Sequence, residues 1–445
     1  MKRLGAAFLS LIFAAPAGAA PLAEIDAGDD SRFALAGERV LMWQDEGPRL
    51  SVREPDGTRR VIYRARSFKR QQSLIGQVAA TDSQLAILTE GYDAAGEGGR
   101  DWSSLRAGPF AGPYDVIAGR EGGASVAGPF GVAASAAGLL VSSRDGDNRA
   151  TLTLRPADGS APVRLGEGAE QVAVNGRWAA TRTSSAAALY DLDSRSRVAE
   201  LMVPTDLQAR PPGAGVSASG TLVYTDESAR LWSYVPATRR RARLMEHVYE
   251  IVGAAGERAY VVQRLETTPY HHLDRLWSVD LGSGEARALT AGLEGTEFST
   301  DGTRLLYSFA GSDGQCVFYG DLPPEAPQRV PVSARCPRQT LTFAVTEQHR
   351  RPRVRMWVSC PGASADERCT GSARLTARAR RGGGRVTLGS WRFSVAGGSS
   401  TTHVMKVRLR RAAPTRRRGK TRHVARLRIT GTRSSRIDRR IVFLG

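Results

Sequence analysis

Two clusters of polar side chains have residue types that could do chemistry. Residues 270–274 read Tyr-His-His-Leu-Asp, whose imidazoles and carboxylate are suited to metal binding or proton transfer. Adjacent residues of an extended chain point in opposite directions, so His271 and His272 are poorly placed to bind one ion. The segment Asp145-Gly-Asp147-Asn148 is rich in oxygen atoms, but a calcium loop needs a more distant bidentate Glu. We therefore expect no metal site.

Catalytic sequence motifs are incomplete. The segment Gly123-Ala-Ser125-Val-Ala127 lacks the final Gly of a nucleophile elbow. The glycines of Gly213-Ala-Gly215 precede a predicted strand, so no helix N-terminus would hold the pyrophosphate of a dinucleotide. We expect no cofactor and favour a protein that is not an enzyme. A catalytic site assembled from residues scattered along the chain stays an alternative.

A repeated pattern must position these residues. A strand of small residues, a turn and a second apolar strand recur seven times, most completely at 298–307, which reads Phe-Ser-Thr-Asp-Gly-Thr-Arg-Leu-Leu-Tyr. The turns lie 36 to 55 residues apart, close to the ~40 to 50 residues of a four-stranded propeller blade. Small residues suit inner strands, which converge on an axis. We predict an all-β protein in which a β-propeller, with seven blades favoured over six or eight, precedes a small antiparallel β-sandwich.

Two sequence motifs of the repeat resemble those of a known family. Residues 298–307 and the segment Leu276-Trp-Ser-Val-Asp-Leu-Gly-Ser-Gly284 resemble the S-P-D-G and L-W-x-x-D phrases of TolB-like, WD40-like bacterial propellers. The resemblance covers about residues 33–332 and departs at Thr300, where the family usually has Pro. It implies a propeller fold and a setting in the cell envelope. It carries over no catalytic residue.

The expected ligand-binding surface is the propeller face where the second hairpin of each blade and the connections between blades emerge. The longest insertions are predicted as loops at 91–102, 143–149 and 264–274. Loops on a rigid scaffold often carry function, although simple solvated hairpins are the alternative. The candidate residues for binding a protein or small ligand are Tyr92, Asp93, Arg100, Asp101, Trp102, Asp145, Asp147, Tyr270, His271, His272 and Asp274.

Composition divides the chain into three parts. Residues 1–20 have the basic start, short apolar run and small-residue end of a secretory signal peptide. Residues 21–335 would form the propeller, and residues 336–445 a basic, immunoglobulin-like sandwich. The net charge is +19, but the chain from Arg338 onward holds 27 Lys and Arg against four acidic residues. The sandwich therefore carries the positive charge, while the rest of the chain is mildly acidic.

The basic sandwich is expected to contact anionic cell-wall polymers or lipid headgroups rather than nucleic acid. The alternative is that arginine protects sheet edges and reflects the codon bias of a GC-rich genome. Around Val358-Ser-Cys-Pro361 the sandwich resembles arginine-rich tails of exported proteins from high-GC Gram-positive bacteria. The predicted polyanion-binding residues are Arg408, Arg410, Arg411, Arg416, Arg417, Arg418, Lys420, Arg422, Arg426 and Arg428.

The four cysteines predict disulfides, because an even number in an exported chain indicates pairing. Three pairings are open, and we favour Cys316 with Cys336 and Cys360 with Cys369. The sequence thus predicts a secreted or extracytoplasmic, envelope-associated monomer that binds a protein or small ligand. The alternative is a propeller hydrolase or lyase acting on glycan or peptide.

Overall fold

The computed structural model describes residues 22–444 with gaps. The residues outside the description are 1–21, 27–29, 31, 45–47, 67–70, 94–99, 120–127, 148, 170, 184, 204–212, 269–270, 291, 294–296, 312–313, 323–341, 349–352, 363–366, 418–419, 432–436 and 445. The predicted signal peptide and Cys336 lie among them. No described helix is long and apolar enough to cross a bilayer.

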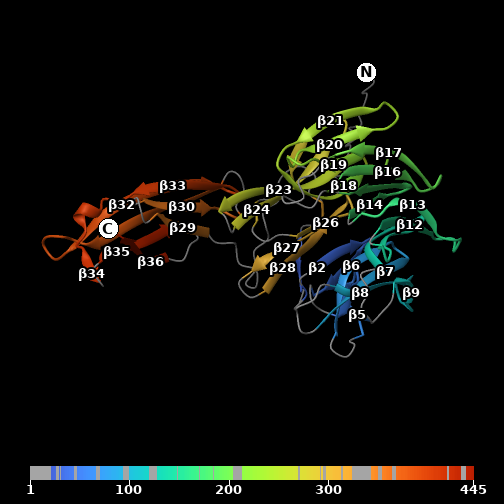
Figure 1. The fold of residues 1–445 in the computed structure, drawn as a ribbon, viewed down its shortest axis with the longest axis horizontal. Coiled ribbons are helices and arrows are strands. Elements are labelled where there is room, and N and C mark those ends of the chain that lie inside the picture. The colour runs from blue at the N-terminus through green and yellow to red at the C-terminus, as the bar shows by residue number, and fades with distance from the viewer. Residues whose placement is uncertain are drawn as a thin grey trace, which may run out of the picture.

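Seven four-stranded antiparallel sheets form a β-propeller, which confirms the predicted fold class (Figure 1). The first strand of each blade is the innermost. Blades 1 to 3 consist of β2 (Arg32–Ala36), β3 (Arg39–Trp43), β4 (Arg49–Arg53) and β5 (Arg59–Arg64); β6 (Gln71–Ala80), β7 (Gln84–Asp93), β8 (Arg100–Pro109) and β9 (Asp115–Gly119); and β10 (Gly128–Ser135), β11 (Gly138–Arg144), β12 (Ala150–Pro156) and β13 (Val163–Glu167).

Blades 4 to 6 follow the same order. They consist of β14 (Gln171–Asn175), β15 (Trp178–Arg182), β16 (Ala186–Asp191) and β17 (Ser196–Met202); β18 (Ala214–Val216), β19 (Leu222–Thr225), β20 (Leu231–Val235) and β21 (Arg240–Met245); and β22 (Val248–Ala255), β23 (Arg258–Thr268), β24 (His271–Asp280) and β25 (Ala286–Ala288).

Blade 7 closes the ring with a strand from the start of the chain. Strands β26 (Glu297–Thr300), β27 (Arg304–Gly311) and β28 (Gly314–Asp321) are completed by β1 (Ala23–Ile25), which pairs antiparallel with β28. The two ends of the propeller are thereby hydrogen-bonded together, and β1 takes the outer position that the fourth strand has in the other blades. The three residues of β1 carry no pattern from which this pairing could be predicted.

The predicted seven turns join the first and second strands of each blade. Gly37 and Gly302 have φ angles of 57° and 91°, a region that L side chains rarely adopt. In the last blade, Asp301 Oδ1 accepts hydrogen bonds from the backbone N–H groups of Thr303 and Arg304, at 2.8 and 2.7 Å. Asp301 is thus a turn former, as its place in the repeat predicts.

Two of the three insertions extend as longer strands rather than the predicted loops, whereas the described residues between β11 and β12 form a turn. Strands β7 and β8 pair as far as Tyr92 and Arg100, and β23 and β24 pair as far as Thr268 and His271. At 10 or 11 residues, these four strands are about twice as long as the middle strands of blades 1, 4 and 5. Glycine and polar residues there suggested loops, but continued cross-strand pairing extends the hairpins. We call the face from which they rise the insertion face.

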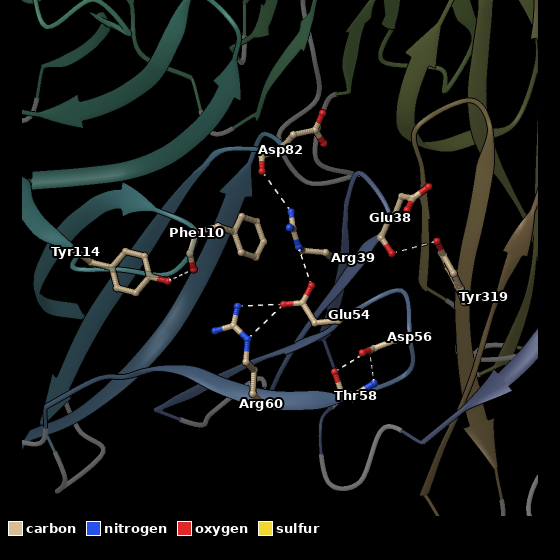
Figure 2. Close-up of polar contacts among 10 residues, drawn as sticks. All are labelled: Glu38, Arg39, Glu54, Asp56, Thr58, Arg60, Asp82, Phe110, Tyr114 and Tyr319. Atoms are coloured by element: carbon tan, nitrogen blue, oxygen red, sulfur yellow. Dashed lines mark hydrogen bonds and ion pairs between the residues drawn. The ribbon is translucent and has the colours of Figure 1, made fainter.

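On the opposite face, polar side chains join blades 7, 1 and 2. Arg39 Nε donates to Glu54 Oε2 at 2.9 Å, and Arg39 Nη1 donates to the carbonyl of Asp82 in the next blade at 3.3 Å (Figure 2). The hydroxyl of Tyr319 donates to the carbonyl of Glu38 at 3.3 Å, which joins blade 7 to blade 1. These polar groups therefore connect blades to one another.

Two further sheets form the sandwich at the C-terminal end, as predicted. One contains β29 (Thr342–Gln348), β30 (Arg353–Ser359) and β33 (Ser400–Lys406). The other contains β32 (Arg385–Ala396), β31 (Arg368–Arg378), β35 (Lys420–Gly431), β34 (Thr415–Arg417) and β36 (Ile437–Leu444). Met405, Leu427 and Ile429 are buried between the sheets, whereas Arg426 and Arg428 are exposed, so buried and exposed residues alternate along β35. Residues 410–423 contain part of the short 3-10 helix η1 (Leu409–Arg411), β34 and the start of β35.

The sandwich contacts blade 6 of the propeller. In Figure 1, β23 and β24 lie between the other blades and the sandwich, and β23 lies against β30. The N–H of Gly362 donates to the carbonyl of Gly292 at 2.8 Å, and Arg275 Nη2 donates to the carbonyl of Gly398 at 3.1 Å. Burial lowers the pKa of Arg275. The Cys360–Cys369 disulfide, which is the favoured pairing, closes the loop containing Gly362.

Candidate functional site

Charged side chains from three blades gather where the axis opens on the insertion face. Arg32 begins the inner strand of blade 1, and Glu297 begins that of blade 7. Arg32 Nη1 lies 2.7 Å from Glu297 Oε1, although 265 positions separate the two residues. Closure of the ring brings them together. Both side chains are more than 40% exposed, so a ligand at this end of the axis can reach them.

Arg264 and Asp274 form a bidentate ion pair near Arg32 and Glu297. Arg264 Nε donates to Asp274 Oδ1 at 2.8 Å, and Nη2 donates to Oδ2 at 3.0 Å. The Asp274 side chain is 1% exposed, and His272 Nε2 lies 3.5 Å from its Oδ2. The Arg264 guanidinium also stacks on Tyr249, 3.3 Å from the ring centre. Burial opposes the charge of Arg264, but hydrogen bonds and the charge of Asp274 outweigh it and raise the pKa of Arg264.

Glu250, on the inner strand of blade 6, supplies a further carboxyl. Water reaches this side chain, yet desolvation by the surrounding protein raises its pKa, and the Glu297 and Asp274 carboxylates raise it further. The charges of Arg264 and Arg32 act in the opposite direction. Among the described residues, no hydrogen-bond donor contacts the Glu250 carboxyl. It is therefore available to a donor or cation on a ligand.

The predicted binding residues do not all meet in one place. Trp102 on β8 is buried, and Asp274 is buried in its ion pair. Asp145 accepts hydrogen bonds from the N–H groups of Asp147 and Arg149, so it shapes an exposed turn. Tyr270 lies outside the described residues. The strands place the backbones of Tyr92, Asp93, Arg100, Asp101 and His271 on the two long hairpins, and their side chains are not described.

Sequence reasoning missed Glu250, Arg32 and Glu297. A usable signal was present, since each is a charged residue at the insertion-face end of an inner strand that is otherwise made of small or apolar residues. In blade 6 the run of small and apolar residues begins at Ile251, directly after Glu250.

The axis itself holds a cavity of about 500 Å³, lined by the inner strands of blades 2 to 7. Asn175 Nδ2 donates to the carbonyls of Val216 and Ala254, at 3.2 and 3.1 Å, and so connects blades 4, 5 and 6. Gln77 exchanges two hydrogen bonds with the backbone of Val132 in blade 3. These amides hold neighbouring blades in register. The described residues contain no group of three His, Cys, Asp or Glu that could hold a metal ion.

The predicted polyanion-binding residues fall on two parts of the sandwich. Arg426 and Arg428 project from the middle of β35, whereas Arg408, Arg410 and Arg411 lie in and before η1; all five are exposed. Arg422 is half-buried in β35. The strands β34 and β35 contain Arg416, Arg417 and Lys420, whose side chains are not described, and Arg418 lies outside the described residues.

The similarity to known proteins concerns the fold alone. No protein-family model and no curated protein matches the chain. Among solved structures, it is similar to catalytically inactive virginiamycin B lyase from Staphylococcus aureus with quinupristin, at 11% identity and a TM-score of 0.42, over 67% of this chain and 99% of that one. It is also similar to the WD40 domain of SCAP from fission yeast, at 9% identity and a TM-score of 0.38, over 66% and 82% of the two chains.

Proposed function

We propose that the protein is an exported, non-enzymatic propeller that binds a protein or small ligand on its insertion face at the cell envelope. The observation that carries the proposal is the Glu250 carboxyl, which lies beside the Arg32–Glu297 ion pair. A ligand with an ammonium group or several N–H donors would complement it. The Cys360–Cys369 disulfide and the resemblance to TolB-like propellers support export, because disulfides persist in oxidising compartments.

A pull-down from the envelope fraction of the native host tests this proposal. The tagged mature protein and its Glu250→Gln variant are used as bait, with Glu285→Gln as the matched control. Glu285 is exposed in the β24–β25 turn, on the opposite face. We expect the Glu250→Gln variant to recover at least about tenfold less partner, which corresponds to roughly 1.4 kcal/mol of binding. Equal recovery by all three proteins would exclude Glu250 from the binding site.

The second candidate is an extracytoplasmic hydrolase or lyase acting on glycan or peptide. The raised pKa of Glu250 favours it, because a carboxyl that keeps its proton nearer neutral pH is suited to acid–base catalysis. Turnover of a glycan or peptide library by the wild-type protein, abolished in Glu250→Gln and retained in Glu285→Gln, would support this candidate over the first.

The Glu250→Gln variant also has a predicted effect on stability. Because the folded-state pKa of Glu250 is raised, the carboxyl favours folding when it is protonated and loses that contribution as pH rises through the folded pKa. The variant should therefore melt about 1 to 2 °C above wild type at pH 7, a small rise because water screens the charge. The two proteins should melt together at about pH 4. A variant that melts lower at pH 7 would contradict the assigned electrostatics.

A further inference from the structure

The outward face of the five-stranded sheet carries a regular set of arginines. Ala373, Leu375 and Ala377 of β31 are buried, so the residues between them point to solvent. The same alternation holds in β32, β35 and β36. We call this surface the arginine face; its exposed arginines include Arg374, Arg378, Arg392, Arg426, Arg428 and Arg440.

The register places like charges directly opposite one another. Arg374 pairs with Arg428 across β31 and β35, and Arg426 pairs with Arg440 across β35 and β36. Like charges in such positions are destabilising. Asp438 is the one acidic residue in the sequences of β31, β32, β35 and β36, and it is already paired with Arg426 and Arg428. The arginine face therefore has a large excess of positive charge.

Edge protection does not account for this arrangement. The sheet order is β32-β31-β35, with β34 and β36 pairing beyond β35, so β31 and β35 have neighbours on both sides. Arg374, Arg378, Arg426 and Arg428 lie on these two central strands. Charges that prevent edge-to-edge pairing are needed on edge strands. The central position of the arginines instead suits a ligand laid across the sheet.

Hydroxyl side chains lie between the arginines. Ser372 pairs with Arg392 on one side and with Thr430 on the other, and Thr376 pairs with Arg426. Guanidinium and hydroxyl donors together are typical of phosphate contacts, and arginine can donate two bonds to one phosphate. Strands lie ~4.8 Å apart and alternate residues ~6.7 Å apart, so a chain with regularly spaced phosphates can contact several arginines at once.

We propose that the arginine face binds a linear, phosphate-bearing polymer. This inference deepens the predicted contact between the sandwich and anionic surface polymers, and it rests on the envelope location in the proposed function. A polymer is favoured over a lipid bilayer because the outward positions of the central strands hold mainly arginine and hydroxyl residues, with Val424 the apolar exception on β35. A surface that inserts into a bilayer needs a larger apolar contact.

The opposite sheet of the sandwich supplies a matched control. Arg353 and Arg355 on β30 and Lys406 on β33 share its outward face, where Val404 and Trp357 lie among them. Removing three charges from this face changes the net charge of the protein by the same amount as removing three from the arginine face. The control thus separates a localised site from a general effect of net charge.

Binding of the full-length mature protein to immobilised long-chain inorganic polyphosphate, measured from 50 to 300 mM salt, tests the inference. We expect the variant Arg374→Gln/Arg378→Gln/Arg428→Gln to bind at least about tenfold more weakly at 100 mM salt, with the slope of log K against log salt smaller by about 2 to 3. The control Arg353→Gln/Arg355→Gln/Lys406→Gln should lose less than about threefold. Melting temperatures of both variants establish that they are folded.

Three outcomes would overturn the inference. They are equal loss of binding in the two triple variants, competition by monomeric phosphate as strong as that by polyphosphate at equal phosphate concentration, and preferential binding to phosphatidylglycerol vesicles. The test is separable from that of the propeller ligand. Loss of polyphosphate binding by the variant Arg374→Gln/Arg378→Gln/Arg428→Gln, with normal recovery of the propeller partner, supports a separate site on the arginine face. Loss of the partner in Glu250→Gln with normal polyphosphate binding supports both.

Discussion

Replacement of Arg264 by methionine is expected to destabilise the propeller by about 3 to 5 kcal/mol, because it leaves the buried Asp274 carboxylate without its charged partner. Asp274 is 1% exposed and receives two hydrogen bonds from Arg264. Methionine keeps much of the side-chain volume, so a loss of this size reports the ion pair rather than a cavity. Urea unfolding of the full-length protein, followed by the fluorescence of its tryptophans, measures the change.

An exposed ion pair in the neighbouring blade provides the control. Arg243 Nη1 lies 3.1 Å from Glu246 Oε1, and the two side chains are 54% and 55% exposed. Because solvent screens such a pair, Arg243→Met should cost less than about 1 kcal/mol. A loss in Arg264→Met no larger than that of the control would show that Asp274 is satisfied without Arg264. Contacts other than the Arg264–Asp274 ion pair would then have to hold the candidate site rigid.

The propeller was predictable because its signal is local and repeated. Each blade contains its own turn, and the pattern around Gly37 returns at Gly176, Gly220 and Gly256, where a left-handed backbone again favours glycine. Seven similar signals at blade-like spacing outweigh the irregularity of any one of them. The basic sandwich was predictable for a similar reason, since alternation along β35 separates Leu427 from Arg426 and Arg428.

The candidate site depends on contacts that no local pattern contains. Arg32 and Glu297 meet because blade 1 packs beside blade 7 when the ring closes, and β1, a strand of three residues, pairs with β28 at that seam. Desolvation raises the pKa of Glu250, and the carboxylates of Glu297 on β26 and Asp274 on β24 raise it further, whereas Arg264 on β23 and Arg32 on β2 act against them. A charge pattern read along one blade therefore could not place these groups together. The sequence shows where the two long insertions lie, but burial of Trp102 and Asp274 depends on packing that the sequence does not reveal.

The arginine face shows the same limit in the sandwich. The sequence shows that arginines alternate with apolar residues, but it does not show which strands are central. β31 pairs with β35, about 50 residues further along the chain, as well as with the neighbouring β32. The strand order places the arginines of β31 and β35 in the middle of the sheet. Protection of sheet edges would need them on the edge strands instead. The two interpretations could be distinguished only once the strand order was known.

Replacement of both Cys360 and Cys369 by serine is expected to lower the stability of the sandwich by about 2 to 3 kcal/mol. The two cysteines are nine positions apart, and a loop of that length accounts for this loss through the added freedom of the unfolded chain. Both side chains are also buried in the sandwich core, so the serine hydroxyls add a desolvation cost. Thermal unfolding of the double variant, with the reduced wild-type protein beside it, measures the effect.

The same change should loosen the contact between the sandwich and blade 6. The disulfide closes the loop that carries Gly362, whose N–H donates to Gly292, while the N–H of Gly398 donates to Cys360. Without the cross-link, the amides of Gly362 and Gly398 should exchange with solvent at least about tenfold faster, whereas the amide of Leu427, deep in the sandwich, should change less because its opening depends on the whole core. Uniform acceleration at all three amides would mean that the disulfide stabilises the sandwich as a whole and that the junction is held by Arg275 and the backbone hydrogen bonds alone.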